Sequence, residues 1–311
     1  MAPKSIKAHF RRFYPGFEPL QFWIPFVEES IGKQVVLSPE SEADVVFTSV
    51  FESRSEMWKR RLQSRLSTPS IPEAPRRKSL AAKSIWVTGE NVRPPARGYD
   101  LTASFDLDEF GGTNVYLPLI LTELDWFSLK RDPQFLRWNS RTGIARLRPQ
   151  DGSLDRQLHD QNRLKFACAF VGNAEPIRMR AIRALESVGQ VDVFGSAVGR
   201  PVASKFEIAQ EYRFMLCFES DLYPGYVTEK VLEAYQCGCI PLWRGVDAAN
   251  LLNPKALVNE HEFATLDKFA SYVANLYSRE DDMFAMSRQA LFLQEPRLNT
   301  VAAAIQRLLT V

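Results

Sequence analysis

The second half of the chain alternates short apolar runs with segments of helical periodicity. Residues 166–171 (FACAFV) are continuously apolar, which is typical of a strand buried on both faces of a parallel sheet. A helical pattern begins at Pro176. Further strands are predicted at 191–194, 214–218 and 239–243, with helices at 205–212 and 228–235. Strict alternation of this kind predicts an α/β fold with a doubly wound parallel sheet and right-handed crossovers.

The first half shows the same alternation less regularly. Strands are predicted at 6–10, 35–37, 45–50 and 85–88, a helix over 17–31, and a basic amphipathic helix over 55–66. Prolines, serines and like charges mark residues 68–79 as an exposed loop. We interpret Arg76–Lys78 within it as a solvated basic run, with contact to an acidic acceptor as the alternative. A polar stretch with little periodicity follows Trp138 and places a domain boundary near residue 155, between domains 1–155 and 156–311.

Composition excludes several classes of protein. The chain has 311 residues, 45% hydrophobic and 24% charged, with a net charge of +2, so neither a disordered chain nor a strongly basic nucleic-acid binder is expected. With only three histidines, neither a histidine-based metal site nor a histidine general base is expected. The N-terminus lacks an apolar signal region, and no apolar run approaches the ~20 residues of a membrane span. No CxxC pair occurs, which predicts buried reduced thiols and a cytoplasmic location; the four cysteines are Cys168, Cys217, Cys237 and Cys239.

Two predicted helices begin with basic residues, where the helix dipole disfavours them. Pro176 is followed by Arg178 and Arg180, and Thr228, a suitable cap, is followed by Lys230. Each helix follows a buried strand, on the side where open α/β sheets bind ligands. A bound diphosphate would accept the helix N–H groups and pair with the basic side chains. Exposed surface charges are the alternative for either residue alone.

The usual glycine fingerprints for phosphate binding are absent. Neither GxGxxG nor GxxxxGK[ST] occurs, so dinucleotide and P-loop binding are not supported. A diphosphate held by arginine and lysine is consistent with a nucleotide-sugar enzyme that uses no metal. The diphosphate is then a leaving group whose growing charge must be stabilised.

The segment 214–245, FMLCFESDLYPGYVTEKVLEAYQCGCIPLWRG, carries the most specific motif. It resembles the signature of the α1,3/4-fucosyltransferase family: a strand ending in FEN, then YxTEK opening a helix, then GxIP and a closing glycine. Upstream, 171–173 with Arg178 and the strand 191–195 resemble further family segments. Gly89-Glu90-Asn91, followed by Tyr99-Asp100 and Phe105-Asp106, resembles the acceptor-side motif of bacterial members.

This resemblance implies a GT-B-type fold, with two Rossmann-like doubly wound domains facing a central cleft. Domain 1–155 is then the acceptor-side domain and 156–311 the nucleotide-sugar (donor) domain. It also implies an inverting, metal-independent glycosyltransferase that moves L-fucose from GDP-fucose to a glycan hydroxyl, with an α1,3-type linkage. Glu90 is expected to be the general base, with Asp106 and Asp108 as alternatives. The expected donor-binding residues are Asn173, Arg178, Glu219, Ser220, Tyr226, Glu229 and Lys230.

Several alternatives remain at this stage. Glu90 is otherwise a turn residue, Glu229 a favourable charge at a helix start, and Tyr226 a core aromatic. Ser220 stands where the family has asparagine, and a shorter hydroxyl can alter the sugar pocket. The same fold acting on a different GDP-deoxysugar is therefore one alternative function, and a non-catalytic nucleotide- or RNA-binding protein is another. The expected partners are a GDP-sugar and an oligosaccharide or surface-polysaccharide acceptor, with no nucleic acid, no metal and at most peripheral membrane contact.

Overall fold

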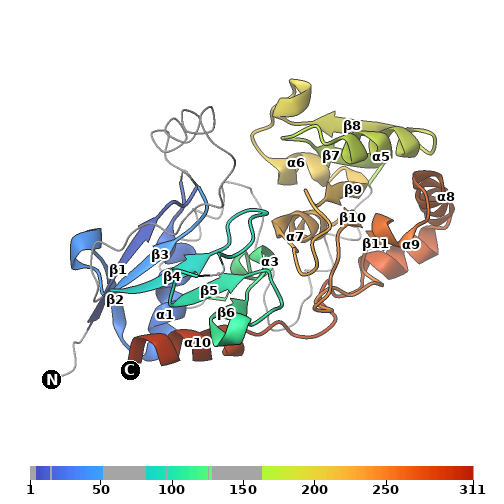
Figure 1. Cartoon of the computed structure of the whole chain (residues 1–311). Helices are drawn as coiled ribbons and strands as arrows, with labels where there is room; N and C mark the ends of the chain where they lie inside the picture. Colours follow the sequence, from blue (N-terminus) through green and yellow to red (C-terminus); the bar gives the residue numbers. More distant parts are fainter. Residues whose placement is uncertain are drawn as a thin grey trace, which may run out of the picture. The chain divides into compact units, whose positions relative to one another are not determined.

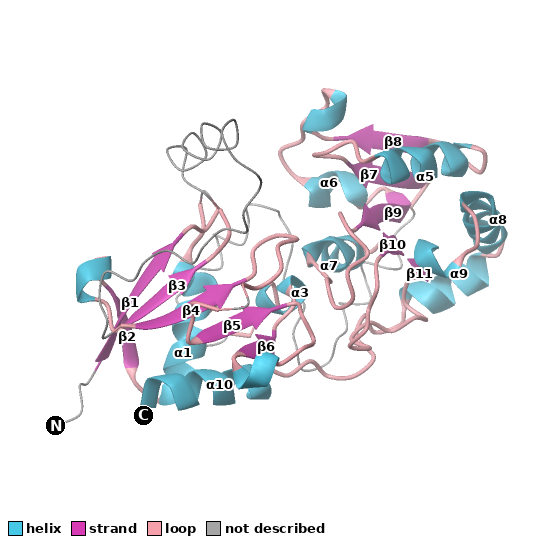
Figure 2. Ribbon diagram, viewed as in Figure 1, coloured by secondary structure: helices cyan, strands magenta, loops and turns pink. Residues whose placement is uncertain are grey.

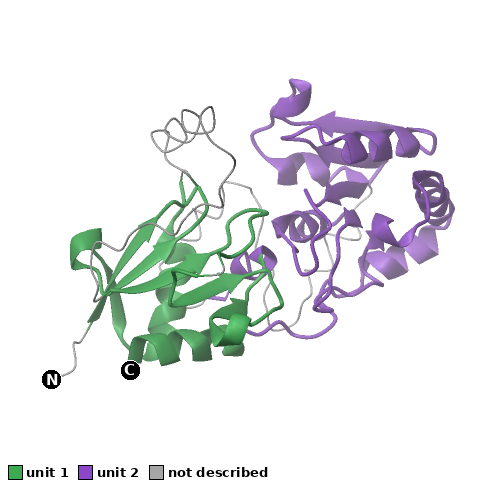
Figure 3. Ribbon diagram, viewed as in Figure 1, with its two compact units in different colours: residues 1–118, 298–311 green, residues 119–297 purple. Residues whose placement is uncertain are grey.

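Two compact units, each built on one parallel sheet, make up the described chain (Figures 1 and 3). The computed structural model describes residues 5–14, 16–51, 82–95, 97–124, 126–127 and 163–310. Unit 1 comprises Met1–Pro118 and Leu298–Val311, and unit 2 comprises Leu119–Arg297. The boundary predicted near residue 155, the basic helix 55–66 and the loop 68–79 lie outside the described residues.

Unit 1 contains a six-stranded sheet in the order β2-β1-β3-β4-β5-β6, and all of its neighbouring strands pair in parallel. The four strands predicted in this half are confirmed, whereas β5 and β6 were not predicted. Polar residues obscure the apolar pattern of β5, because Thr102 and Ser104 are buried and donate to Asn114 Oδ1 on β6, each at 2.8 Å. The strands are β1 (Ser5–Arg11), β2 (Gln34–Leu37), β3 (Val45–Thr48), β4 (Lys83–Val87), β5 (Leu101–Ser104) and β6 (Asn114–Tyr116).

Helices α1 (Trp23–Ile31) and α10 (Asn299–Thr310) pack against each other in this unit. The single helix predicted over 17–31 is divided, because a short 3₁₀ turn at Pro19–Gln21 precedes α1. α1 ends at Gly32, whose φ of 66° suits a glycine at this position. α10 also contacts β5 and β6. Residues Leu298–Val311 therefore belong to unit 1. The division predicted from the sequence placed them in the second domain, 156–311.

Unit 2 contains a five-stranded parallel sheet in the order β11-β10-β9-β7-β8. Helices cover both faces of it, with α5 and α8 on one face and α6 and α7 on the other (Figure 2). Each strand and helix predicted here is confirmed within a few residues, and all four cysteines are buried and free. The strands are β7 (Lys165–Phe170), β8 (Val191–Phe194), β9 (Tyr212–Phe218), β10 (Ile240–Arg244) and β11 (Val258–Asn259). The helices are α3 (Leu119–Thr122), α5 (Pro176–Glu186), α6 (Lys205–Ala209), α7 (Glu229–Gln236), α8 (Leu266–Tyr277) and α9 (Glu280–Ser287).

The strand order of each sheet reverses direction once. In unit 2, β8 lies on one side of β7 and β9 on the other; in unit 1, β2 and β3 flank β1 in the same way. Ligands of open α/β sheets bind beyond the carboxyl ends of the strands at such a point. In unit 2 that rule indicates the carboxyl ends of β7 and β9. Among the helices in the described ranges, none combines the length and apolarity needed to cross a bilayer.

Candidate functional site

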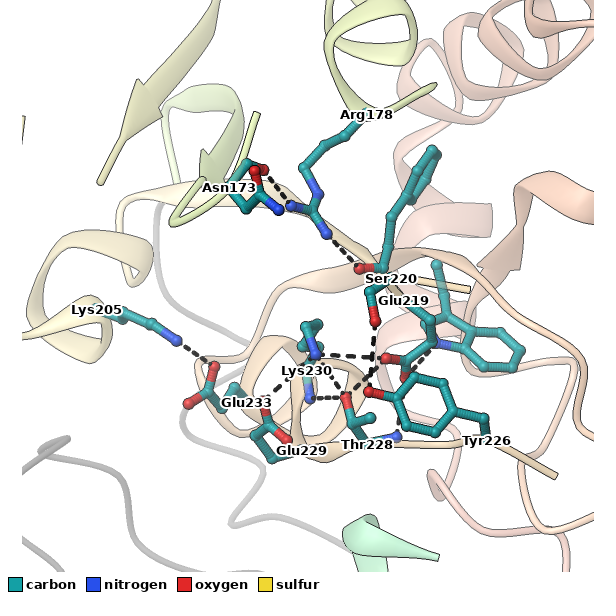
Figure 4. A network of polar contacts seen from close by, with 12 residues as sticks. Asn173, Arg178, Lys205, Glu219, Ser220, Tyr226, Thr228, Glu229, Lys230 and Glu233 are labelled. Atoms are coloured by element: carbon teal, nitrogen blue, oxygen red, sulfur yellow. Dashed lines mark hydrogen bonds and ion pairs between the residues drawn. The ribbon is translucent and has the colours of Figure 1, made fainter. Parts of the chain in front are cut away.

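The carboxyl ends of β7 and β9 are where the two unusually charged helices begin. α5 follows β7 and α7 follows β9, and the two helices lie on opposite faces of the sheet. Figure 4 shows Arg178 of α5 and Lys230 of α7 directed toward the same end of β9. Arg178 binds the carbonyl of Phe218, the last residue of β9, and Lys230 pairs with Glu219, the next residue. The sheet thus brings two cations from separate helices to one point.

Arg178 is buried rather than a surface charge, with 8% of the residue exposed. Its Nη1 donates to the carbonyl of Asn173 at 2.7 Å, and its Nη2 donates to that of Phe218 at 3.0 Å. These bonds fix the guanidinium across the gap between the ends of β7 and β9. Burial lowers the pKa of Arg178, while Glu175 and Glu219 oppose the change. A buried arginine in this place suits an anionic ligand.

Glu219 is the centre of a buried polar network. Its Oε1 accepts from the backbone N–H of Thr228 at 2.9 Å and from the indole Nε1 of Trp243 at 3.2 Å. Its Oε2 accepts from the Thr228 hydroxyl at 2.8 Å and lies 3.5 Å from Lys230 Nζ. The carboxylate side chain is 0% exposed. Glu219 therefore holds the start of α7 in place, a different position from the direct donor contact that we expected.

Lys230 lies between two carboxylates. Its Nζ is 3.5 Å from Glu219 Oε2 and 3.6 Å from Glu229 Oε1, and it donates to the Thr228 hydroxyl at 3.0 Å. Burial lowers the pKa of Lys230, but Glu229 and Glu219 outweigh burial and raise that pKa above its ordinary value. Burial raises the pKa of Glu229, but Lys230, the backbone N–H of Glu229 and Lys205 together outweigh burial and bring that pKa below its ordinary value. Lys230 is thus a permanent cation, held in a fixed place at the first turn of α7.

Two hydroxyl groups complete this edge of the sheet. Ser220 is exposed, and its Oγ lies 3.4 Å from the hydroxyl of Tyr226. Tyr226 is 1% exposed, and burial raises its pKa to about 12, so the phenol stays protonated near neutral pH. Asn173 is exposed and donates through Nδ2 to Glu175. All seven donor-binding residues expected from the sequence therefore lie at this one edge of unit 2.

A second ion pair extends the network along α7. Lys205, the first residue of α6, lies 2.8 Å from Glu233 Oε2. Glu233 is one helical turn beyond Glu229 (Figure 4). Burial raises the pKa of Glu233, and Lys205 opposes the rise. Sequence reasoning did not identify Lys205 or Glu233, because ion pairs between distant helices leave no local pattern.

Trp243 is another residue that sequence reasoning missed. It is 1% exposed, and its indole N–H reaches Glu219 from the neighbouring strand β10. A buried tryptophan usually needs a hydrogen-bond acceptor for its indole N–H. A tryptophan in the predicted strand 239–243 was therefore a weak indication that a buried acceptor lies nearby. Gly245 admits the indole, since a Cβ there would lie 2.1 Å from Trp243 Cζ2.

We expect Gly245→Ala to destabilise unit 2 by about 1–3 kcal/mol, the usual cost of overpacking a core. The added methyl group displaces the indole that binds Glu219, so GDP affinity should fall as well. Urea denaturation of the purified variants measures the effect. Gly172→Ala is the matched control at the same edge of the sheet, because a Cβ there meets nothing within 4 Å. A Gly245→Ala protein as stable as this control would contradict the prediction.

Glu90 lies in unit 1, on the loop after β4. It is exposed, and its carbonyl accepts from the Thr88 hydroxyl at 3.2 Å and from the N–H of Val92 at 2.6 Å. The alternative Asp106 is buried and paired with Arg93 at 2.7 Å. The other alternative, Asp108, is exposed, and its Oδ1 accepts from the N–H of Phe110. Exposure favours Glu90 and Asp108 over Asp106 as proton acceptors.

Comparison with known proteins identifies relatives of this chain, and a family model matches most of unit 2. Residues 160–286 match the model of glycosyltransferase family 10 (fucosyltransferase), C-terminal part. Alpha-(1,3)-fucosyltransferase FucT of Helicobacter pylori is 30% identical over 236 residues, which cover 71% of this chain and 48% of the relative. The human 3-galactosyl-N-acetylglucosaminide 4-alpha-L-fucosyltransferase FUT3 is 31% identical over 34% of this chain and 30% of the relative. The chain thus spans about half or less of these relatives' length.

Solved structures match the chain over its whole length. An α1,3-fucosyltransferase structure has a TM-score of 0.73 at 24% identity, and the match covers 100% of this chain and 91% of that structure's chain. A structure of α1,3-fucosyltransferase with GDP has a TM-score of 0.70 at 23% identity, and the match covers 100% of this chain and 92% of that structure's chain. A structure with GDP-fucose gives 0.69 at 22% identity, with the same coverage. Residues 160–286 therefore carry a glycosyltransferase family 10 (fucosyltransferase) domain, and the chain as a whole has the α/β GT-B fold of the α1,3-fucosyltransferases.

Proposed function

We propose that this protein transfers L-fucose from GDP-fucose to a hydroxyl group of a glycan, with inversion at the anomeric carbon and an α1,3-type linkage. The observation that carries the proposal is the placement of Arg178 and Lys230. They come from helices on opposite faces of one sheet, and both reach the carboxyl end of β9. Solved structures of the same fold contain GDP and GDP-fucose.

The proposed donor site uses charge and helix ends to bind the diphosphate. Two positively charged side chains and the first-turn N–H groups of α5 and α7 would balance its negative charge. Glu229, at the same helix start, and the exposed Ser220 hydroxyl would contact the rest of the nucleotide-sugar. The buried Tyr226 hydroxyl, 3.4 Å from Ser220 Oγ, would support that contact from behind. These cations would neutralise the charge of the diphosphate, as a divalent ion does in other nucleotide-sugar enzymes. We therefore propose a reaction that requires no metal.

The proposed reaction is a single displacement. The acceptor oxygen bonds to the anomeric carbon as that carbon's bond to the diphosphate oxygen breaks, and the electron pair leaves with GDP. Glu90 takes the proton of the acceptor hydroxyl, which contributes about 10²–10⁴-fold to the rate. Arg178 and Lys230 stabilise the charge that grows on the diphosphate, and positioning of the two substrates supplies the remainder. Attack opposite the leaving group inverts the anomeric configuration.

Ser220 supports one alternative donor. The hydroxyl lies close to the backbone and contacts Tyr226, whereas the family's asparagine reaches further and offers both an amide donor and a carbonyl acceptor. A different GDP-deoxysugar is therefore the second candidate donor. The RNA-binding alternative depended on basic residues that lie outside the described part of the chain, and no observation favours it. A cytoplasmic location, a surface-polysaccharide acceptor and at most peripheral membrane contact stay predictions.

Calorimetric titration in the presence of EDTA tests the donor. We expect GDP and GDP-fucose to bind and UDP-glucose not to bind, with GDP-mannose as the comparison within guanine nucleotides. Transfer is then measured by mass spectrometry against a panel of glycans, and NMR gives the anomeric configuration of the product. A protein that binds no guanine nucleotide would overturn the proposal. Tight binding and transfer of another GDP-sugar would replace fucose with that sugar.

A further inference from the structure

The carboxyl edge of the unit 1 sheet carries aromatic side chains on the segments that follow its strands. Strands β1, β3 and β4 are neighbours and run in parallel (Figure 1), so the segments after them, which begin at Arg12, Ser49 and Thr88, emerge at the same edge. The strand order of this unit reverses at β1, which β2 and β3 flank. Ligands of open α/β sheets bind at such a point. This edge is therefore where unit 1 is expected to hold a ligand.

Close contacts connect the three segments. The chain leaves β1 through Arg12, whose φ of 59° lies in the left-handed region, and such strain concentrates at functional sites. The N–H of Phe51, after β3, donates to the carbonyl of Arg12 at 2.9 Å. The Phe51 ring lies against Gly89, after β4, where a Cβ would be only 2.9 Å from Phe51 Cε2. Because Gly89 directly precedes Glu90, the Phe51 ring packs beside the proposed base.

Tyr14 is the exposed aromatic residue of this edge. Its ring centroid lies 5.9 Å from that of Phe51 and 5.6 Å from that of Phe17, edge to face in both pairs. Phe17 stacks in turn on Phe13 at 3.8 Å. Tyr14 is 42% exposed, whereas the other three rings are partly buried. Ring contacts hold Tyr14 in place, so little side-chain freedom remains to be lost on binding.

The neighbourhood of Glu90 restricts what these rings can contact. In the proposed reaction an acceptor hydroxyl gives its proton to Glu90, so the sugar ring that bears this hydroxyl lies beside that residue. The contacts from Tyr14 to Phe51 and from Phe51 to Gly89 bring both rings to the same place. Ligand sites commonly combine aromatic walls with a few polar groups that fix orientation.

The chemistry of the two rings fits a sugar. A pyranose has one face rich in C–H groups, which packs against aromatic rings, and hydroxyl groups at its edge. Tyr14 offers an apolar ring together with a phenolic hydroxyl, and Phe51 offers a ring alone. The exposed carboxylate of Glu90 accepts from a hydroxyl at the edge of the sugar.

We propose that Tyr14, with Phe51, binds the C–H face of the acceptor pyranose ring and so positions its hydroxyl for Glu90. This assignment rests on the proposed function, since it takes the ligand at this edge to be the acceptor glycan. Tyr14 then determines affinity for the acceptor, whereas the proposed donor-binding residues lie in unit 2.

Tyr14→Ala tests the assignment, because it removes the exposed ring and leaves Phe51 in place. We expect an acceptor KM raised by about tenfold, the order that one aromatic contact supplies, with kcat within about threefold of the wild type and GDP affinity unchanged. Tyr14→Leu keeps most of the packing against Phe17 and should show a rise in the same direction. Tyr14→Phe keeps the ring and should give a KM near that of the wild type.

Tyr272→Ala is the matched control for Tyr14→Ala. Tyr272 is 43% exposed and its ring lies 5.3 Å from that of Phe263, but it belongs to unit 2. Its acceptor KM should equal that of the wild type. An acceptor KM within twofold of the wild type in Tyr14→Ala, or an equal rise in Tyr272→Ala, overturns the assignment.

A binding experiment separates this inference from the proposed function. Saturation-transfer NMR with methyl β-galactoside and methyl β-N-acetylglucosaminide reports contact with the sugar ring whether or not fucose is transferred. Ring-proton signals that the wild type and Tyr14→Phe show and Tyr14→Ala loses would support the sugar site, even if GDP-fucose proves to be the wrong donor. The same signals in wild type and Tyr14→Ala, or none in the wild type, would overturn it.

Discussion

Lys230→Ala is expected to weaken GDP binding by about 10–100-fold, because a charge-assisted hydrogen bond contributes roughly 1.5–3 kcal/mol. We also expect kcat to fall by about 10²–10³-fold, the usual loss when one group that stabilises developing charge is removed. Lys230 is the cation that two carboxylates hold at the start of α7. Calorimetry with GDP and steady-state kinetics with GDP-fucose measure the two effects.

The same variant should be less stable, and its loss of stability should depend on pH. Without Lys230 the buried carboxylate of Glu219 loses its ion-pair partner, which costs about 2–3 kcal/mol for a pair that is not wholly enclosed. Burial already raises the pKa of Glu219 above its ordinary value of 4.5, and the variant raises it further. An acid whose pKa is higher in the folded state destabilises the fold as pH rises above its unfolded value. The deficit is therefore largest near neutral pH and shrinks as pH falls toward 4.5.

Lys165→Ala is the matched control for this experiment. Lys165 pairs with Glu211 in the same unit, but both side chains are half-exposed, and solvent screens such surface pairs so that they add little to stability. Urea denaturation at neutral pH and near pH 5 should show little pH-dependent difference between this control and the wild type. If the deficit of Lys230→Ala were constant over that range, Glu219 would not be the group that Lys230 compensates.

Glu90→Gln is expected to reduce kcat by about 10²–10⁴-fold, the contribution of general-base catalysis. The amide keeps the shape of the side chain and most of its hydrogen bonds, but it does not accept a proton at working pH. Because Glu90 lies in unit 1 and the proposed GDP-binding residues lie in unit 2, GDP affinity should stay within about twofold of the wild type. Kinetics and calorimetry on the same preparation measure both quantities.

Asp108→Asn is the control for the identity of the base. Asp108 is exposed on the loop after β5 in the same unit, and its Oδ1 accepts from the N–H of Phe110. Asparagine keeps this acceptor oxygen, so the loop should be preserved and kcat should change little. A large loss of kcat in Asp108→Asn, together with normal turnover in Glu90→Gln, would transfer the role of base to Asp108.

The strands of unit 2 could be predicted because fully buried parallel strands are short and continuously apolar, as FACAFV is. β5 could not be predicted, since Thr102 and Ser104 are polar, and their acceptor is Asn114 on the next strand. Helix α10 belongs to unit 1 through contacts with α1, near the other end of the sequence. Contacts of that range leave no periodic pattern from which to infer them.

The sequence brought attention to two residues of the candidate site through local electrostatics, although their role in binding stays a prediction. Arg178 and Lys230 were identified because basic residues at a helix start are unfavourable without a ligand, and the structure places both at one end of β9. The position of Glu219 did not follow, because Trp243, which encloses it, comes from the neighbouring strand. Motif spacing specifies which residues occur in a site, whereas strand pairing decides which of them can reach a ligand.

The return of α10 to unit 1 has a consequence for biosynthesis. Unit 2 lies within the sequence of unit 1, between Pro118 and Leu298. As the chain leaves the ribosome, all of unit 2 emerges before α10, so α1 lacks its packing partner until α10 has been made. N-terminal domains usually fold first during synthesis. Here the order is reversed: unit 2, with the proposed nucleotide site, can complete its fold before unit 1 gains helix α10.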